Sequence, residues 1–359
     1  MKIHKLGEPY VIMSNPHGKH NYFAWPTLAR IRDGRLAVAA SGFRIDHVCP
    51  FGKAVLAFSD DEGKTFTPPV VIIDTVLDDR DAGLCPFGEN GLILTSFNNT
   101  VEFQRKINAK SNAPQKKAYV SAYLDRISEE EEKEALGITF RISRDNGKTF
   151  GEIHKSPVSS PHGPVELKDG TVLWVGWTLT GDHVFAYTLD TENGNMQLLG
   201  EIDISEIKAA GLFPNESYAA ELADGTLLCH IRADGTGGKR AFTLFQSVSH
   251  DGGKTWSKPE SLLPENGGAP AHIITHSSGT VISAYTYREE PYGIKAMFSR
   301  DGGKTWDKDN YICESPYPTH DIGYPSTAEL ADGSLLTVFY AKSAQYTSAI
   351  IAQRWRFDE

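Results

Sequence analysis

Short apolar runs, each introduced by a turn dipeptide, recur along the whole chain. The dipeptides are Asp33-Gly34, Asn90-Gly91, Asp169-Gly170, Asp224-Gly225, Ser278-Gly279 and Asp332-Gly333. Asp-Gly and Asn-Gly between apolar runs are the strongest short signal for a β-hairpin, because both residues tolerate a positive φ. The pattern therefore predicts six hairpins and an all-β fold.

The spacing of these hairpins predicts how they are arranged. Neighbouring dipeptides are 54 to 57 residues apart, except for one interval of 79 residues between the second and the third. A period near 50 in an all-strand chain is typical of a propeller with four strands per blade. We therefore expect one six-bladed β-propeller domain over residues 1–359. A short helical insertion is expected at 101–137 in blade 2, with its helix at 128–135 (SEEEEKEA), and strand 347–355 should close the ring beside a strand near 10–13.

A second repeated pattern is an octapeptide with four copies. They are 59–66 (SDDEGKTF), 143–150 (SRDNGKTF), 249–256 (SHDGGKTW) and 299–306 (SRDGGKTW). The aspartate at the third position can accept hydrogen bonds from nearby backbone N–H groups and hold a tight turn. A calcium loop of the EF-hand kind needs more carboxylates at alternate positions. We therefore interpret the octapeptides as architecture and not as chemistry.

Composition narrows the class of partner. The 359-residue chain has a formal net charge of −10, which disfavours a nucleic-acid surface. No apolar run is long enough for a membrane span or a signal-peptide core, so a cytoplasmic location without a membrane partner is expected. The four cysteines lack CxxC spacing and are expected to be free thiols, with no metal and no cofactor: Cys49, Cys85, Cys229 and Cys313.

Ionisable and aromatic residues gather shortly before the turn dipeptides, and others follow the apolar runs. In a propeller these positions meet at one mouth of the central channel, the kind of concave polar site that binds ligands. Before the dipeptides lie Trp25, Asp79, Arg80, Asp81, His162, Glu216, His272, Asp321 and Tyr324. After the runs lie Arg44, Arg232 and Arg288.

The octapeptide SxDxGxT(W/F) resembles the Asp-box of the sialidase superfamily, and the resemblance covers nearly the whole chain. It implies a six-bladed propeller with the active site at one end of the channel and the Asp-boxes at the periphery. Segment 215–232 (NESYAAELADGTLLCHIR) resembles the one that carries a glutamate and an arginine of the carboxylate-binding triad, which maps Glu216 and Arg232. Segment 323–340 resembles the one with the tyrosine nucleophile, which maps Tyr324. A phenol is a poor nucleophile at neutral pH, and a neighbouring carboxylate can take its proton.

One departure from the family concerns its first triad arginine, which lies in a Phe-Arg-Ile-Pro motif. Here the matching residues are Phe23-Ala24-Trp25-Pro26, with alanine in place of arginine. Arg44 and Arg80 are the candidates to compensate, and Trp25 is expected to stack on a sugar face. The family's acid/base aspartate lies in a loop after the first hairpin.

In that loop Asp46 is the nearest match to the acid/base aspartate. Asp79 and Asp81 are its rivals.

Three functions remain open from the sequence. The first is a sialidase-like exo-glycoside hydrolase that acts on a terminal, acidic sugar of a glycan. The second is a polysaccharide lyase or histidine-dependent glycosidase, in which Arg232 or Arg288 neutralises a uronate and His162, His272 or Tyr324 abstracts a proton. The third is a non-catalytic carbohydrate-binding propeller. Each expects a small-molecule or oligosaccharide ligand.

Overall fold

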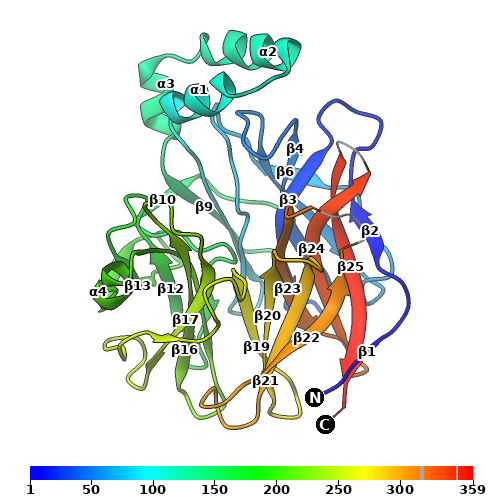
Figure 1. The fold of residues 1–359 in the computed structure, drawn as a ribbon, viewed down its shortest axis with the longest axis vertical. Coiled ribbons are helices and arrows are strands. Elements are labelled where there is room, and N and C mark those ends of the chain that lie inside the picture. The colour runs from blue at the N-terminus through cyan, green and yellow to red at the C-terminus, as the bar shows by residue number, and fades with distance from the viewer. Residues whose placement is uncertain (316–318, 345–346, 359) are drawn as a thin grey trace.

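The structure is a computed structural model that describes residues 1–315, 319–344 and 347–358. Its strands form four four-stranded sheets and one nine-stranded sheet, paired antiparallel except at one point. Innermost strands of successive sheets contact one another, β3 with β7, β15 with β19, β19 with β23, and β23 back to β3. A ring of antiparallel sheets is a β-propeller, so the all-β propeller fold is confirmed (Figure 1).

Each four-stranded sheet is a meander in chain order. The first contains β7 (Leu84–Phe87), β8 (Gly91–Phe97), β9 (Ile138–Ser143) and β10 (His154–Ser156). The second contains β11 (Val165–Glu166), β12 (Val172–Trp177), β13 (Val184–Leu189) and β14 (Met196–Ile202). The third contains β15 (Leu212–Glu221), β16 (Leu227–Gly235), β17 (Phe242–Ser249) and β18 (Glu260–Ser261). The fourth contains β19 (Ala271–Thr275), β20 (Val281–Tyr287), β21 (Gly293–Ser299) and β22 (Asp307–Glu314).

The nine-stranded sheet joins the two ends of the chain. From the N-terminal part it takes β1 (Ile3–Lys5), β2 (Tyr10–Met13), β3 (Tyr22–Arg30), β4 (Leu36–Arg44), β5 (Lys53–Ser59) and β6 (Val70–Ile73). From the C-terminal part it takes β23 (Ile322–Glu329), β24 (Leu335–Ala344) and β25 (Thr347–Phe357). The expected pairing that closes the ring is confirmed, because β2 pairs with β25.

The number of separate sheets differs from the six predicted blades. Four sheets stand alone, and a parallel pairing of Ser348 with Tyr22 connects β25 to β3, so that the first and last groups of strands become one sheet. The spacing of hairpins along a sequence carries no information on such a lateral contact, which is why the sequence did not predict it.

The predicted hairpins are present: five of the turn dipeptides lie between two antiparallel strands, and in the sixth, Asn90-Gly91, the glycine is already the first residue of β8. In five of them the dipeptide glycine has a positive φ, as Gly225 does at 86°. The second hairpin differs, because Gly88 and not Gly91 has the positive φ, at 53°. All four cysteines are free, as expected, and all four are also buried.

The four octapeptides are hydrogen-bonded turns. In each, the aspartate accepts a backbone N–H bond of 2.8–2.9 Å and a hydroxyl bond of 2.6 Å from the threonine four residues later. These bonds favour the charged carboxylate and lower the pKa of each aspartate to about 2; the residues are Asp61, Asp145, Asp251 and Asp301. The architectural interpretation of the octapeptides therefore has a direct structural basis.

These turns predict a loss of stability in acid. A carboxylate whose pKa falls from 3.8 to about 2 on folding stabilises the folded state above about pH 4, and this stabilisation is lost as the pH falls through 2. We expect the melting temperature to fall over that window. Asp61→Asn should lower it by a few degrees at neutral pH and flatten the acid slope, measured by circular dichroism. The neighbouring Asp60→Asn is the matched control, and equal effects of both changes would contradict this account.

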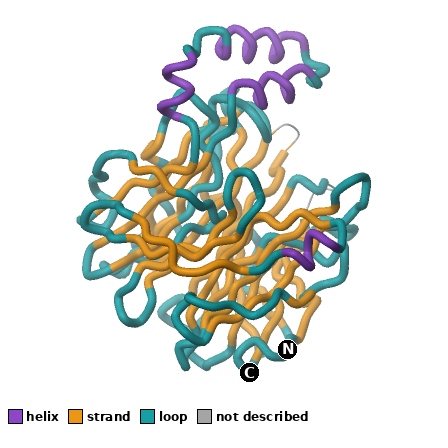
Figure 2. The backbone as a smooth tube through the Cα atoms, turned by 90° about the vertical axis from the view of Figure 1, so that its left-hand side faces the viewer, coloured by secondary structure: helices purple, strands orange, loops and turns teal. Residues whose placement is uncertain are grey.

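Three helices lie between β8 and β9, at the end of the molecule opposite both termini (Figures 1 and 2). They are α1 (Val101–Ala109), α2 (Pro114–Leu124) and α3 (Glu129–Ala135). The predicted helix is α3, which begins with a capping box between Ser128 and Glu131. Helices α1 and α2 were not predicted, although the Thr100 cap and Pro114 at a first helical position are start signals.

The remaining helix is α4 (Ser205–Ala209), before β15. None of the described helices is long and apolar enough to cross a membrane.

Candidate active site

Three of the predicted site residues form one hydrogen-bonded cluster. The Tyr324 hydroxyl of β23 donates a very short hydrogen bond to Oε1 of Glu216 on β15. From β16, Nη1 of Arg232 donates to Oε2 of Glu216 at 2.6 Å and to the Tyr324 hydroxyl at 3.1 Å. The structure therefore brings together a phenol, a carboxylate and a guanidinium from three innermost or adjacent strands.

Local irregularities of the strands aim these side chains. The pairing register shifts between Pro214 and Ser217 in β15 and between Gly323 and Ser326 in β23. Such bulges bend a strand and redirect a side chain. Tyr324 itself has a φ of 56°, and its backbone N–H donates to the Thr286 hydroxyl at 2.9 Å. A positive φ at a tyrosine is strained and is found where the surroundings hold it in place.

The electrostatics of the cluster keep the phenol protonated. Burial raises the pKa of Tyr324 well above 10, the charges of Glu216 and Asp81 raise it further, and Arg232 and Arg288 oppose the shift. A neutral phenol bonded to a carboxylate has its proton acceptor already in place. The cluster can therefore generate a nucleophilic oxygen as the proton moves to Glu216.

Arg232 and Arg288 differ in the protein groups that they already bind. Arg232 bonds Glu216 and also both carboxylate oxygens of Asp234, at 3.1 and 2.9 Å. Arg288 donates only to the Ile322 carbonyl at 3.1 Å and the Tyr340 hydroxyl at 3.3 Å, with no carboxylate partner in the described ranges. Of these two guanidinium groups, Arg288 is therefore the one without a carboxylate partner among the described residues.

Phe242 is a residue of this region that the sequence analysis missed. The guanidinium carbons of Arg232 and Arg288 both lie 4.8 Å from its ring centroid. A phenylalanine at the start of a strand gives no sequence signal of this role. The ring fixes the spacing of the two cations through cation–π contacts.

Asp81 makes no described hydrogen bond to this cluster but is close enough for its charge to raise the pKa of Tyr324. It is 3% exposed and has a φ of 53°. Burial raises its pKa to about 7, with Arg80 opposing and Glu216 adding to the rise. Its Oδ1 has no hydrogen-bond partner within the described residues, and the nearest cation is Arg80 Nε at 3.7 Å. A carboxyl half protonated at neutral pH suits general acid catalysis.

The other two aspartates considered as acids lie in different surroundings. Burial raises the pKa of Asp79 to about 7 as well, so the pKa alone does not separate it from Asp81. Asp79 differs in that it accepts the backbone N–H and the hydroxyl of Thr75, at 2.6 and 2.9 Å, within a turn. The Asp46 carboxylate pairs with Lys116 of α2 and accepts the His47 backbone N–H at 2.8 Å. No described hydrogen bond or ion pair links any of the three aspartates to Tyr324 or Glu216, but of the three only Asp81 is among the main charges that shift the pKa of Tyr324.

Trp25 is not placed as a platform for a sugar. Its ring is 1% exposed, and the guanidinium carbons of Arg80 and Arg44 lie 4.1 and 4.6 Å from its centroid. Arg44 is fully buried and pairs with Asp78 at 2.5 Å. The expected stacking of Trp25 on substrate is therefore corrected, because protein groups already cover the ring.

Asp321 organises the side of the mouth nearest to Trp25. Its Oδ1 accepts hydrogen bonds from the Tyr22 hydroxyl at 2.8 Å and the Tyr340 hydroxyl at 3.2 Å, and lies 3.1 Å from His47 Nδ1. Burial would raise the pKa of Asp321, but the His47 and Tyr22 bonds bring it down to about 2. Three protein partners thus occupy this carboxylate. Tyr22 was missed from the sequence, although it directly precedes the Phe23-Ala24-Trp25-Pro26 motif.

The two histidines meet each other inside the channel. His162 and His272 are both buried, with ring centroids 4.9 Å apart, and His272 stacks on Tyr218 at 4.8 Å. Burial holds the pKa of His162 well below 6.5 and that of His272 at about 3, so both rings are neutral. No described hydrogen bond or ring contact joins either histidine to Tyr324 or Glu216.

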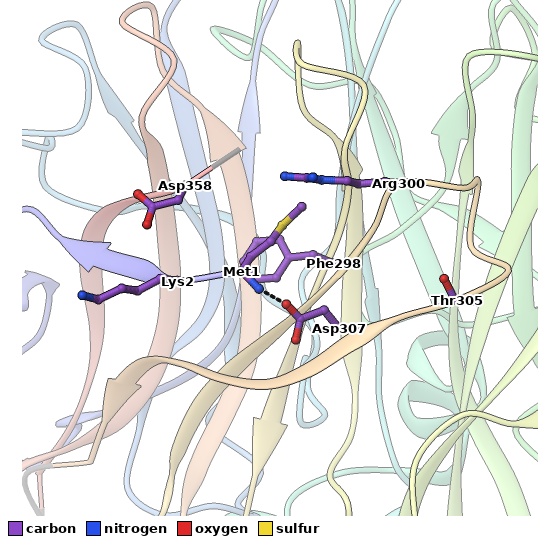
Figure 3. A pocket seen from close by; sticks show the side chains of 7 residues that line it. All are labelled: Met1, Lys2, Phe298, Arg300, Thr305, Asp307 and Asp358. Carbon is purple, nitrogen blue, oxygen red and sulfur yellow. Dashed lines mark hydrogen bonds and ion pairs between the residues drawn. The ribbon is translucent and has the colours of Figure 1, made fainter.

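A separate pocket of about 520 Å³ lies near both termini (Figure 3). Its lining consists of Met1, Lys2, Phe298, Arg300, Thr305, Asp307 and Asp358, and its main ion pair joins the Met1 amino group to Asp307. It contains none of the predicted site residues. Among the residues that the structure describes, no three His, Cys, Asp or Glu side chains are grouped as metal ligands.

Solved structures share this fold. A protein of unknown function from Dyadobacter fermentans is 20% identical with a TM-score of 0.76, and the match covers 99% of both chains. The Hadza microbial sialidase Hz136 is 16% identical with a TM-score of 0.67, over 96% of this chain and 68% of its own. The NanB sialidase from Streptococcus pneumoniae is 13% identical with a TM-score of 0.68, over 97% and 70%. At these identities the likeness concerns the fold alone.

No curated protein sequence matches the chain significantly. The family model described as a BNR repeat-like domain matches residues 128–337, more than half of the sequence. That stretch contains Glu216, Arg232, Arg288 and Tyr324. The chain belongs to the BNR repeat-like domain family.

Proposed function

We propose that this protein is a sialidase-like exo-glycoside hydrolase that acts on a terminal, acidic sugar of a glycan. The observation that carries the proposal is the part-buried hydrogen bond from Tyr324 to Glu216, with Arg232 bonded to both. Tyrosine nucleophiles are a known exception to the two-carboxylate scheme of glycosidases. The sialidases among the structural neighbours support the same reaction class.

In the first step, the Tyr324 oxygen attacks the anomeric carbon while its proton passes to Glu216. The bond to the leaving oxygen breaks, and the Asp81 carboxyl protonates that oxygen. In the second step, water attacks the anomeric carbon, Asp81 takes its proton, and Glu216 returns a proton to the departing phenolate. Two displacements at one carbon retain the anomeric configuration.

Arg288 is proposed to receive the carboxylate of the substrate. A guanidinium presents a planar fork that matches a carboxylate, and this one has no acidic partner in the described part of the chain. Arg232 then serves mainly to hold Glu216 and Tyr324. The alanine at position 24 leaves the site with fewer free cations than the usual triad.

The proposed architecture retains six blades in a single domain over 1–359. In this view the nine-stranded sheet supplies two blades. Strands β3–β6 form one, and β23–β25 with β1 and β2, which pair with β25, form the other. The two blades are joined where Ser348 pairs with Tyr22. Residues 101–137, with α1 to α3, are an insertion in the second blade.

A substrate panel tests the proposed reaction. Chromogenic glycosides of sialic acids, uronic acids and neutral sugars are followed for dye release, and uronate oligosaccharides for the ultraviolet absorbance of an unsaturated product. We expect dye release from an acidic glycoside with retained configuration. Unsaturated product without dye release would replace the hydrolase with a lyase, and binding without either product would leave a carbohydrate-binding propeller.

Arg288→Ala tests the role of the free guanidinium. Loss of a hydrogen bond to a charged group costs about 1.5–3 kcal/mol, so the KM for the acidic glycoside should rise roughly 10- to 100-fold. The methyl ester of the same glycoside lacks the negative charge and is the matched control. If Arg288→Ala lowered kcat/KM equally for the acidic glycoside and its methyl ester, Arg288 would not bind the substrate carboxylate.

A further inference from the structure

His47 is an ionisable residue at the channel mouth that the proposed reaction does not use. It lies in the loop after β4, and its ring packs edge-on against Trp25 with the ring centroids 5.1 Å apart. The ring of Tyr324 also packs edge-on against Trp25, with the centroids 6.3 Å apart. The imidazole and the proposed nucleophile therefore contact the same tryptophan.

A chain of polar contacts joins His47 to the guanidinium that is proposed to bind the substrate carboxylate. His47 Nδ1 lies 3.1 Å from Asp321 Oδ1, and the Tyr340 hydroxyl donates to the same oxygen at 3.2 Å. Arg288 Nη2 donates to that hydroxyl at 3.3 Å. The positive charge of Arg80 also acts on the imidazole. His47 thus belongs to the same polar network of the mouth as Arg288.

The Asp321 carboxylate determines which nitrogen of the imidazole carries the hydrogen. The pKa of Asp321 is about 2, so this carboxylate has no proton to donate at neutral pH, and the Tyr22 hydroxyl already donates to its Oδ1 at 2.8 Å. The contact with His47 is therefore favourable only with the hydrogen on Nδ1. Burial lowers the pKa of His47 below 6.5, although the bond to Asp321 opposes the shift. The ring is then neutral at pH 7, and Nε2 is a hydrogen-bond acceptor.

This second nitrogen is available to a ligand. Nε2 of His47 has no hydrogen-bond partner among the described residues, and the side chain is 44% exposed. Nε2 of His162 also lacks a partner, but it is fully enclosed by protein. An acceptor held in a fixed direction by a carboxylate, in the same network as a carboxylate-binding arginine, is suited to a hydroxyl group of the sugar bound there.

We propose that His47 is a specificity residue whose Nε2 accepts a hydrogen bond from one hydroxyl group of the terminal acidic sugar bound by Arg288. The inference rests on the proposed hydrolase function and adds a requirement on its substrate. The sugar must carry a free hydroxyl at that position, because an analogue without it leaves the acceptor unpaired and binds less well.

Two substitutions separate this contact from the bond between His47 and Asp321. An asparagine amide can still donate to Asp321 but has no atom at the position of Nε2, whereas a glutamine amide reaches that position. His47→Asn is expected to raise KM roughly 3- to 10-fold, the loss of one neutral hydrogen bond, with kcat unchanged. His47→Gln should keep KM within about twofold of the wild-type value.

The matched control is His183→Asn. The His183 side chain is 49% exposed and also pairs with a carboxylate through Nδ1, that of Glu201 at 2.7 Å, but it has no described contact with the residues of the mouth. Its substitution should leave KM unchanged.

The probes are the aryl glycosides of N-acetylneuraminic acid and of glucuronic acid, each also prepared with single hydroxyl groups removed. For the parent glycoside that is hydrolysed, one deoxy form should raise the wild-type KM roughly 3- to 10-fold, and His47→Asn should not raise it further. No effect of His47→Asn on the parent, or an equal effect on every deoxy form, would overturn the role of His47 while leaving the hydrolase intact.

No hydrolysis of any probe would overturn the hydrolase. Calorimetric titration of the full chain with N-acetylneuraminic acid and with glucuronic acid then decides the role of His47. Binding that is weakened by His47→Asn but not by His183→Asn supports the contact. Binding that is unchanged by both substitutions, or no binding of either sugar, overturns it.

Discussion

Replacing Tyr324 with phenylalanine is expected to lower kcat by about 10³-fold or more on any glycoside that the protein hydrolyses. The change deletes one oxygen, and the nucleophile is lost with it. Losses of that order follow removal of a residue that forms the covalent intermediate. Initial rates of dye release measure the effect, with KM expected to change little because the ring still fills its buried position.

The matched control is a tyrosine at the same mouth without a carboxylate base. Tyr340 bonds Asp321 and Arg288 but makes no described bond to Glu216. Tyr340→Phe should therefore reduce the rate far less than Tyr324→Phe. If Tyr324→Phe retained most of the wild-type rate while folding normally, the nucleophile would lie elsewhere, and the proposal would fail.

Asp81→Asn is the second large expected effect, and it depends on the leaving group. Asparagine cannot protonate a departing oxygen, so the rate on an alkyl glycoside or a natural linkage should fall by about 10²–10⁴-fold, the usual worth of general acid catalysis. A nitrophenyl leaving group departs without such help, and its release should be affected much less. Rates on the two substrates, measured in parallel, give the ratio.

The dependence of the rate on pH is an independent test of the role of Asp81 as the acid. Asp81 acts as the acid when protonated, and its pKa is about 7, so the rate with the poor leaving group should fall as the pH rises above 7. In Asp81→Asn this alkaline limb should disappear. Asp79→Asn is the comparison, because burial raises the pKa of Asp79 to about 7 too, although its carboxylate is bonded to Thr75. Loss of the limb in Asp79→Asn instead would transfer the acid role to that residue.

The sequence predicts the periodic part of this molecule well, for a physical reason. Turn dipeptides and Asp-boxes are local, and each one specifies its own hairpin, as Asp301 shows by bonding Thr305 within its own octapeptide. Lateral contacts are not local. The Ser348–Tyr22 pairing that merges two groups of strands joins residues 326 positions apart, and nothing near either residue signals it.

The candidate site shows the same division. The resemblance of two segments to sialidases pointed to Glu216, Arg232 and Tyr324, which the structure places within hydrogen-bond distance. The spacing of residues along the sequence could not decide which of three aspartates is the acid, because their partners in the fold distinguish them. Asp81 is buried and its Oδ1 has no hydrogen-bond partner among the described residues, whereas Asp79 accepts a hydrogen bond from Thr75 in a turn. Nor could spacing show that two arginines cover Trp25.

The most direct test of the central claim is to trap the covalent intermediate. A glycoside with a good leaving group and a fluorine beside the anomeric carbon slows the second step, and the protein is then digested and analysed by mass spectrometry. The account predicts a glycosyl adduct on the peptide that contains Tyr324, absent in Tyr324→Phe. Hydrolysis that proceeds with inversion and without any adduct, or an adduct on a different residue, would contradict it.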